Sequence, residues 1–149
     1  MGGVSIITKY QEFEPNTDNL KVPRSTEKET WDFVMEECDR AIRLLPETRN
    51  NPSEDKRRAT KWTAYALKSR AALHAASVAK YWDKAPLEGE AVDKNFVGLD
   101  KSDASRYYQA CIDASKAIIA SNRFGLYKAH PGSVQEAIAN YRALFTDPN

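Results

Sequence analysis

Few side chains of this 149-residue chain have the types and spacings that support acid–base, nucleophilic or metal chemistry. Its two histidines are His74, inside an alanine-rich stretch, and His130, which precedes a proline. Neither Cys38 nor Cys111 has a histidine placed to activate it, and no Cys-x-x-Cys pair or Cys/His cluster points to zinc. There is no Gly-x-Ser-x-Gly elbow and no Gly-rich phosphate loop. We therefore expect no catalytic residue, no metal ligand, no cofactor and no enzymatic activity.

One segment, DKNFVG (93–98), resembles the start of a calcium-binding loop, with Asp93, Asn95 and Gly98 in place. An EF-hand loop also needs an oxygen ligand at its fifth position and a bidentate glutamate at its twelfth. The chain has Val97 and Ala104 at those positions, so we interpret the segment as a surface turn. The paired carboxylates elsewhere fall on predicted solvent faces, where a solvated charge is the simpler interpretation.

Three aromatic residues in or beside one long loop, Tyr81, Trp82 and Phe96, are the candidates for ligand binding. Exposed aromatic rings can stack on the apolar C–H face of a sugar ring. The alternative is that they anchor the loop onto the neighbouring helices, which the usual behaviour of large apolar side chains favours. Sugar binding by Tyr81, Trp82 and Phe96 is therefore a hypothesis.

Composition indicates one globular domain without a strong electrostatic bias, with 42% hydrophobic residues, 29% charged residues and a formal net charge of +1. This balance gives no reason to expect a nucleic-acid partner or an anionic membrane surface. No run of 18 apolar residues predicts a membrane span, and the first ten residues do not resemble a signal peptide. The two cysteines lie on apolar faces of predicted helices, so we expect small core residues rather than a disulfide.

Hydrophobic periodicity predicts an all-α fold with four main helices, at 26–45, 59–82, 103–121 and 133–145. Capping boxes, Thr26 with Glu29 and Ser133 with Glu136, mark the starts of the first and the fourth. Residues 1–25 are expected to be an extended arm, forming a short strand or docking on the helices. Residues 82–102 are expected to be a long loop.

The second predicted helix contains eight alanines within RATKWTAYALKSRAALHAASVAKYW (58–82). Small or apolar residues cover most of its circumference, as in a helix covered by neighbours on two sides. In addition, ECDRAI (37–42) and DASKAI (113–118) match each other, and each follows an aromatic residue at the same offset, Trp31 and Tyr107. We therefore predict a tetratricopeptide-like repeat of helix pairs, an α–α superhelix, in which 82–102 is an insertion.

Four blocks of the chain resemble, in order and spacing, the SusD/RagB family of outer-membrane nutrient-uptake lipoproteins of Bacteroidetes. GGVSIIT (2–8) resembles the family's Gly-Gly-Val-Pro-Leu-Ile arm. LKVPRSTEKETWDFVMEECDRAIRLLPE (20–47) resembles its Pro-Arg-Ser-Thr segment and the helix that follows. The alanine-rich stretch and YYQACIDASKAIIASNRFGLY (107–127) resemble the next two helices.

The resemblance implies a non-catalytic, tetratricopeptide-like scaffold in a surface-exposed lipoprotein of the cell outer membrane. In this family the lipoprotein acts as the lid of a SusC-like TonB-dependent transporter and captures oligosaccharides or, in some members, peptides. The family's ligands are held mainly by loops outside the helices. None of its binding residues can be matched to a position here.

The chain departs from the family pattern in two ways. Ser5 stands where the family arm usually has proline. Family members also run to several hundred residues and begin with a lipoprotein signal, whereas this chain opens at the arm and stops at LFTDPN. We therefore expect a segment of a larger SusD-like domain, whose first and fourth helices keep apolar faces exposed and cause self-association or weak stability in isolation.

A second interpretation is a self-contained tetratricopeptide-like adaptor that binds a peptide or a protein partner in a concave groove. The DNA that flanks this segment discriminates between the two. A lipoprotein signal upstream, a continuation downstream and an adjacent transporter gene would support the first interpretation.

Overall fold

A computed structural model describes residues 2–13, 15, 17–49, 58–85, 87–128 and 130–146. The fold is all-α, with no strand in these residues. The four main helices are α1 (Glu27–Leu44), α3 (Lys61–Tyr81), α5 (Ala104–Ala120) and α6 (Val134–Thr146). Short elements lie between them: the 3₁₀ turns η1 (Thr17–Leu20), η2 (Trp82–Lys84) and η3 (Lys101–Asp103), and the one-turn helix α4 (Glu90–Asp93).

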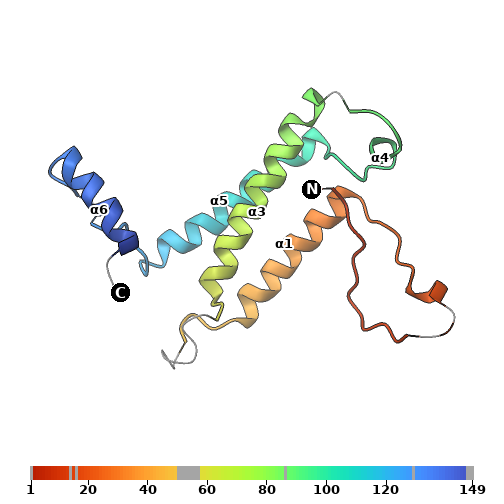
Figure 1. Ribbon diagram of the computed structural model, residues 1–149, viewed down its shortest axis with the longest axis horizontal. Helices are drawn as coiled ribbons and strands as arrows, with labels where there is room; N and C mark the ends of the chain where they lie inside the picture. Colours follow the sequence, from red (N-terminus) through yellow and green to blue (C-terminus); the bar gives the residue numbers. More distant parts are fainter. Residues whose placement is uncertain are drawn as a thin grey trace.

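Helix α3 is the centre of the molecule and packs against both α1 and α5, which crosses behind it in Figure 1. Its buried residues are all alanines: 64, 71, 72, 75, 76 and 79. Ala72, Ala75 and Ala76 are completely buried. Because alanine has no side chain beyond Cβ, two helices can approach α3 closely, near the short end of the roughly 8–10 Å range of interaxial distances. The expectation of a helix covered on two sides is confirmed.

The start of α1 is fixed by the predicted capping box. The Glu29 backbone N–H donates to the Thr26 hydroxyl (3.1 Å), and the Thr26 backbone N–H donates back to the Glu29 carboxylate (2.8 Å). The second predicted capping box forms in a modified way at α6. There the Glu136 N–H donates to the Ser133 hydroxyl (3.1 Å), but the Glu136 carboxylate accepts from the N–H of Gly132 (2.7 Å).

A polar network ties α1 to α5 at the end where α5 begins. The Asp32 carboxylate accepts hydrogen bonds from Arg106 (2.7 Å) and from the Tyr107 hydroxyl (2.8 Å). Burial alone would raise the pKa of Asp32, but these two hydrogen bonds and the neighbouring cations outweigh it, so the pKa of Asp32 lies below its usual range. Burial and the bond to Asp32 raise the pKa of Tyr107. Lys28 adds an ion pair to Asp103 (2.9 Å).

The N-terminal arm docks against the start of α1 without forming a strand. The Ser25 N–H donates to the Val4 carbonyl (3.1 Å), and the Arg24 side chain donates to the Gly3 carbonyl (2.6 Å). A Cβ atom added to Gly3 would lie 1.9 Å from the Ser25 carbonyl oxygen, so only glycine allows this approach. Of the two options that the sequence left for the arm, the structure shows the docked segment.

Helix α6 lies beyond the C-terminal end of α5, apart from α1 and α3 (Figure 1). None of its residues is buried. The 82–102 segment, predicted as one long loop, contains η2, α4 and the start of η3. Both cysteines are free; Cys38 is buried and Cys111 is half-buried, as expected for small core residues. The predicted repeat and superhelix stay a prediction.

The close packing around α3 gives a first test. Replacing Ala76 by leucine adds three carbons at a fully buried site, and we expect the free energy of unfolding to fall by about 1–3 kcal/mol. The same change at the exposed Ala66 of this helix is the control, with an expected effect within about 0.5 kcal/mol. Urea unfolding measures both, and equal effects at the two sites would contradict this account of the core.

The Asp32 network gives a test with a pH signature. Because the folded-state pKa of Asp32 is lowered, its stabilisation is present above the unfolded pKa of about 4 and is lost as pH falls through the lower folded value. Asp32→Asn should therefore cost about 1 kcal/mol at pH 7 and progressively less below about pH 4. Unfolding curves at neutral and acidic pH measure this, with the exposed Glu88→Gln as control. A cost that does not change with pH would contradict it.

Candidate functional site

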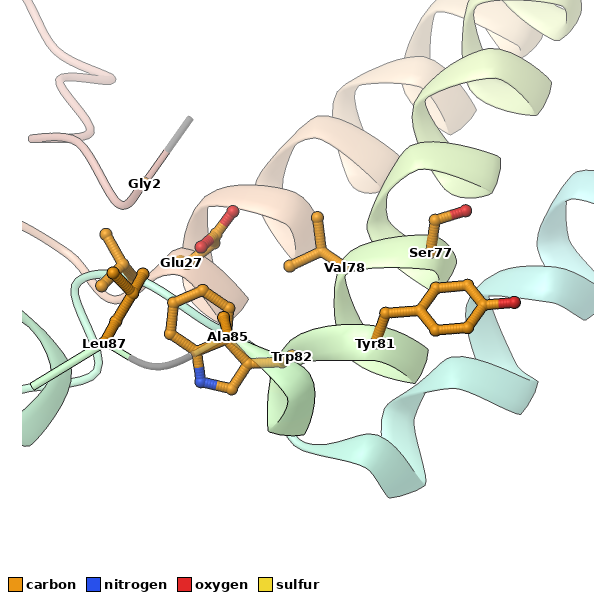
Figure 2. Close-up of a pocket in the computed structure, with 9 residues that line it drawn as sticks. Gly2, Glu27, Ser77, Val78, Tyr81, Trp82, Ala85 and Leu87 are labelled. Carbon is orange, nitrogen blue, oxygen red and sulfur yellow. The ribbon is translucent and has the colours of Figure 1, made fainter.

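The site that contains two of the three predicted aromatic residues is a cavity of about 360 Å³ at the C-terminal end of α3 (Figure 2). The arm, the first turn of α1, the last turn of α3 and the segment after α3 all contribute to its wall. Its lining residues are Gly2, Glu27, Ser77, Val78, Tyr81, Trp82, Ala85, Leu87 and Val97. Most of these side chains are apolar, with Glu27 as the one charged group.

Trp82 forms one side of the cavity and also holds the 82–98 segment in place. Its half-buried indole lies directly against the backbone of Gly98, where an added Cβ would be 2.1 Å from the ring. Gly98 has a φ of +94°, which side-chain-bearing residues rarely adopt. The anchoring role that the sequence left as the alternative is therefore present at Trp82, while one side of the ring remains part of the cavity.

Glu27 is the polar group of the site, and it is only 3% exposed. Its carboxylate accepts hydrogen bonds from the Gly98 N–H (2.6 Å) and from the Trp31 indole N–H (3.2 Å). Its own backbone N–H donates to the carbonyl of Asn95 (3.0 Å). In the described part of the chain no cation pairs with this carboxylate. Glu27 thus joins the loop to α1 and leaves acceptor capacity beside the cavity.

Tyr81 is 49% exposed, and its ring points away from Trp82 (Figure 2). Successive helical residues project about 100° apart, so the two rings present different surfaces. The ammonium groups of Lys80 and Lys84 lie 5.2 and 5.0 Å from the Tyr81 ring centroid. The Tyr81 ring is thus exposed and, unlike Trp82, does not hold the 82–98 segment in place.

Phe96 is half-buried outside the lining of the cavity. Its ring lies under the guanidinium of Arg24, 5.0 Å from the ring centroid, and its carbonyl accepts from the Gly3 N–H (2.6 Å). The structure therefore brings Tyr81 and Trp82 to one cavity. It places Phe96, a residue of the loop, against the N-terminal arm. The three aromatic residues do not form one continuous stacking surface.

The cavity offers two kinds of contact, an apolar surface at Trp82 and its aliphatic neighbours and a carboxylate acceptor at Glu27. An apolar C–H face can lie against Trp82 and its aliphatic neighbours, while hydroxyl groups can donate to Glu27. Within the described ranges no group of three or more His, Cys, Asp or Glu side chains is arranged to hold a metal ion. Neither histidine lines this cavity: His74 packs on Trp31 (5.4 Å between ring centroids), and His130 is exposed.

Sequence reasoning did not single out Glu27 as the polar group of the cavity, nor Gly98 as the residue that packs against Trp82. Glu27 is the first residue of α1, where a carboxylate normally faces solvent and interacts with the helix dipole. Its position directly after the capping threonine was visible, but its burial depends on a loop about 70 residues away in sequence, and no local pattern shows that. In the sequence, Gly98 stands out only as the glycine of the imperfect calcium-loop pattern at 93–98.

The contact between Gly98 and Trp82 can be tested by mutation. Gly98→Ala places a Cβ inside the indole and strains a left-handed residue, so we expect a loss of at least about 2 kcal/mol in the free energy of unfolding. Gly89→Ala separates the two causes, since Gly89 has a φ of +101° but open space around it; its cost is backbone strain alone, about 1–3 kcal/mol, and should stay below that of Gly98→Ala. Gly125→Ala, in open space without positive φ, is the neutral control. Urea unfolding measures all three, and equal losses for Gly98→Ala and Gly89→Ala would show that the indole contact contributes nothing.

None of the described helices is long and apolar enough to cross a membrane. Comparison of the chain with protein-family models, with curated proteins and with solved structures gives no match.

Proposed function

We propose that the chain is a non-catalytic scaffold segment of a SusD/RagB-like lipoprotein of the outer membrane. The lipoprotein captures oligosaccharides and delivers them to a SusC-like TonB-dependent transporter. The proposal rests on the resemblance of the four sequence blocks, with Tyr81 and Trp82 as the candidate contacts for sugar.

One structural observation supports this proposal more than the others. The Gly-Gly arm, the Pro-Arg-Ser-Thr segment and the loop after the alanine-rich helix, which are far apart in sequence, meet at one place. Gly3 donates to the Phe96 carbonyl (2.6 Å) and accepts from Arg24, while its Cα lies against Ser25. Two of the blocks that carry the resemblance, 2–8 and 20–47, thus contact each other at the border of the candidate cavity.

The packing of the helices is compatible with a tetratricopeptide-like scaffold. Helices α1, α3 and α5 follow one another in the chain as neighbours, and α3 contacts both of the others. In such a scaffold, ligand contacts fall on loops and helix ends, which is where Trp82 and Tyr81 lie.

Tyr81 offers the sharpest test of sugar binding, because replacing it leaves the Trp82 anchor intact. In the full-length protein, Tyr81→Ala should weaken retention of the bound oligosaccharide by about tenfold with an unchanged melting temperature. Affinity electrophoresis against a panel of glucan, xylan and mannan oligosaccharides measures this, with the exposed arm residue Tyr10→Ala as control. Co-purification of a TonB-dependent transporter with the full-length protein tests the partner.

Two results would count against the proposal: no oligosaccharide retained by the full-length protein, or no transporter found with it. A sugar that binds equally well to Tyr81→Ala would contradict only the assignment of this residue. The alternative, a tetratricopeptide-like peptide adaptor, predicts a start codon and a stop codon that frame these 149 residues.

A further inference from the structure

An open apolar groove runs between α1 and α3. It consists of two adjoining cavities, of about 640 and 220 Å³, that share Val34 and Leu67. Side chains of α1 and α3 line them, and none of α5 does. Leu67 and Leu73 are 57% and 50% exposed here, although both are large apolar residues in the central helix. A groove between two helices with exposed leucines is the shape that an amphipathic third helix fills.

The same chain carries an amphipathic helix that packs on no groove. Along α6, Val134, Ile138, Tyr141 and Phe145 recur at spacings of four, three and four residues and so form one stripe. All four side chains are at least 50% exposed. A helix of about this length is marginal in water by itself, so it needs burial of this stripe to be stable.

The connection between α5 and α6 keeps α6 away from the groove of its own chain. Phe124 is held against Trp62 at the start of α3 (6.1 Å between ring centroids), and Arg123 pairs with Glu47 (2.9 Å). The following segment does not serve as a free tether, because Leu126 and Pro131 line a cavity together with α6 residues. Residues 126–128 and Pro131 therefore lie beside α6.

Charge complementarity favours α6 as the occupant of the groove. Glu37 lines the groove from α1, and its side chain is 49% exposed; among the described residues its ion-pair partner is Arg40, at 3.6 Å. On α6, Arg142 follows Tyr141 and lies one turn after Ile138, at the flank of the apolar stripe. Arg142 has no ion pair in the described part of the chain. A helix seated by its stripe would bring this guanidinium beside Glu37, at the end of the groove away from Arg70, the other charged lining residue.

We infer that α6 of one copy docks in the α1–α3 groove of a second copy, and that the exchange is reciprocal. The lengths agree: α6 has 13 residues, and the groove extends along α3 from Ala64 to Ser77, so each spans about 20 Å. Two reciprocal contacts close a two-fold dimer, which is the commonest symmetric assembly. This inference concerns the 149-residue chain itself and does not depend on sugar binding.

Sedimentation of the wild-type chain over about a hundredfold range of concentration is the first measurement. We expect a reversible dimer of the 16.8 kDa chain. Leu67→Glu and Phe145→Glu should each give a monomer. The first places a carboxylate in the apolar groove, and the second places one in the apolar stripe of α6. Ile119→Glu, at a residue of α5 that is 73% exposed and outside the groove, is the matched control and should leave the dimer intact. Because all three positions are exposed, circular dichroism should show folded variants.

Mixing the two monomeric variants identifies the contact. Leu67→Glu retains an intact α6 and Phe145→Glu an intact groove, so an equimolar mixture should form a heterodimer through one remaining contact. A charge exchange gives independent support: Glu37→Arg and Arg142→Glu should each raise the dissociation constant, and the double variant should restore it.

Three results would overturn the inference. A wild-type chain that is monomeric at every concentration would mean that its own α6 or a different partner covers the groove. Dimerisation of Leu67→Glu would place the contact elsewhere, for example between two α6 helices. Failure of the mixed variants to associate would exclude the α6–groove contact.

Discussion

The close approach of three helices at the alanines of α3 is the constraint on which the rest of the structure depends. Fully buried alanines such as Ala72 and Ala76 contribute little transfer free energy each, so the core is stabilised by many short contacts rather than by large side chains. The larger core side chains, Trp31, Met35 and Tyr107, come from α1 and α5 and lie around this helix. Such a core is closed around the buried alanines, so the open cavities lie at the helix end near Trp82 and along the outer groove of α1 and α3.

At the C-terminal end of α3 the alanines give way to Tyr81 and Trp82, and the packing becomes irregular there. Glu27 compensates with hydrogen bonds that a small residue could not make, since it joins the first turn of α1 to the loop at Gly98. Burial of this carboxylate is tolerated because two N–H groups donate to it. The same arrangement that closes the loop therefore also places an aromatic ring, Trp82, and an acceptor, Glu27, on the wall of one cavity.

Sequence reasoning predicted the elements that depend on local patterns. The all-α class and the four main helices are confirmed, with ends within two residues of those expected, because caps and 3.6-residue periodicity are local signals. The docked arm and the place of each aromatic residue in the loop depend on contacts between distant segments, such as Gly3 with Phe96 and Trp82 with Gly98. These contacts have no periodic signature. For that reason Tyr81, Trp82 and Phe96 could be recognised as aromatic residues near a loop, but not sorted into anchor and exposed surface.

The apolar surface that stays open is informative about the chain as a unit. Burial of the core depends on α1, α3 and α5, whereas Leu67, Leu73 and the stripe of α6 remain in water. Exposed leucines in α3 and an exposed apolar stripe on α6 each cost free energy in water. The groove and the stripe are complementary in shape, so each can cover the other. Burying both apolar surfaces against a neighbour would remove this cost. That contact has to cover the α1–α3 groove, which meets the cavity at Trp82 only at Ser77, a residue that lines both.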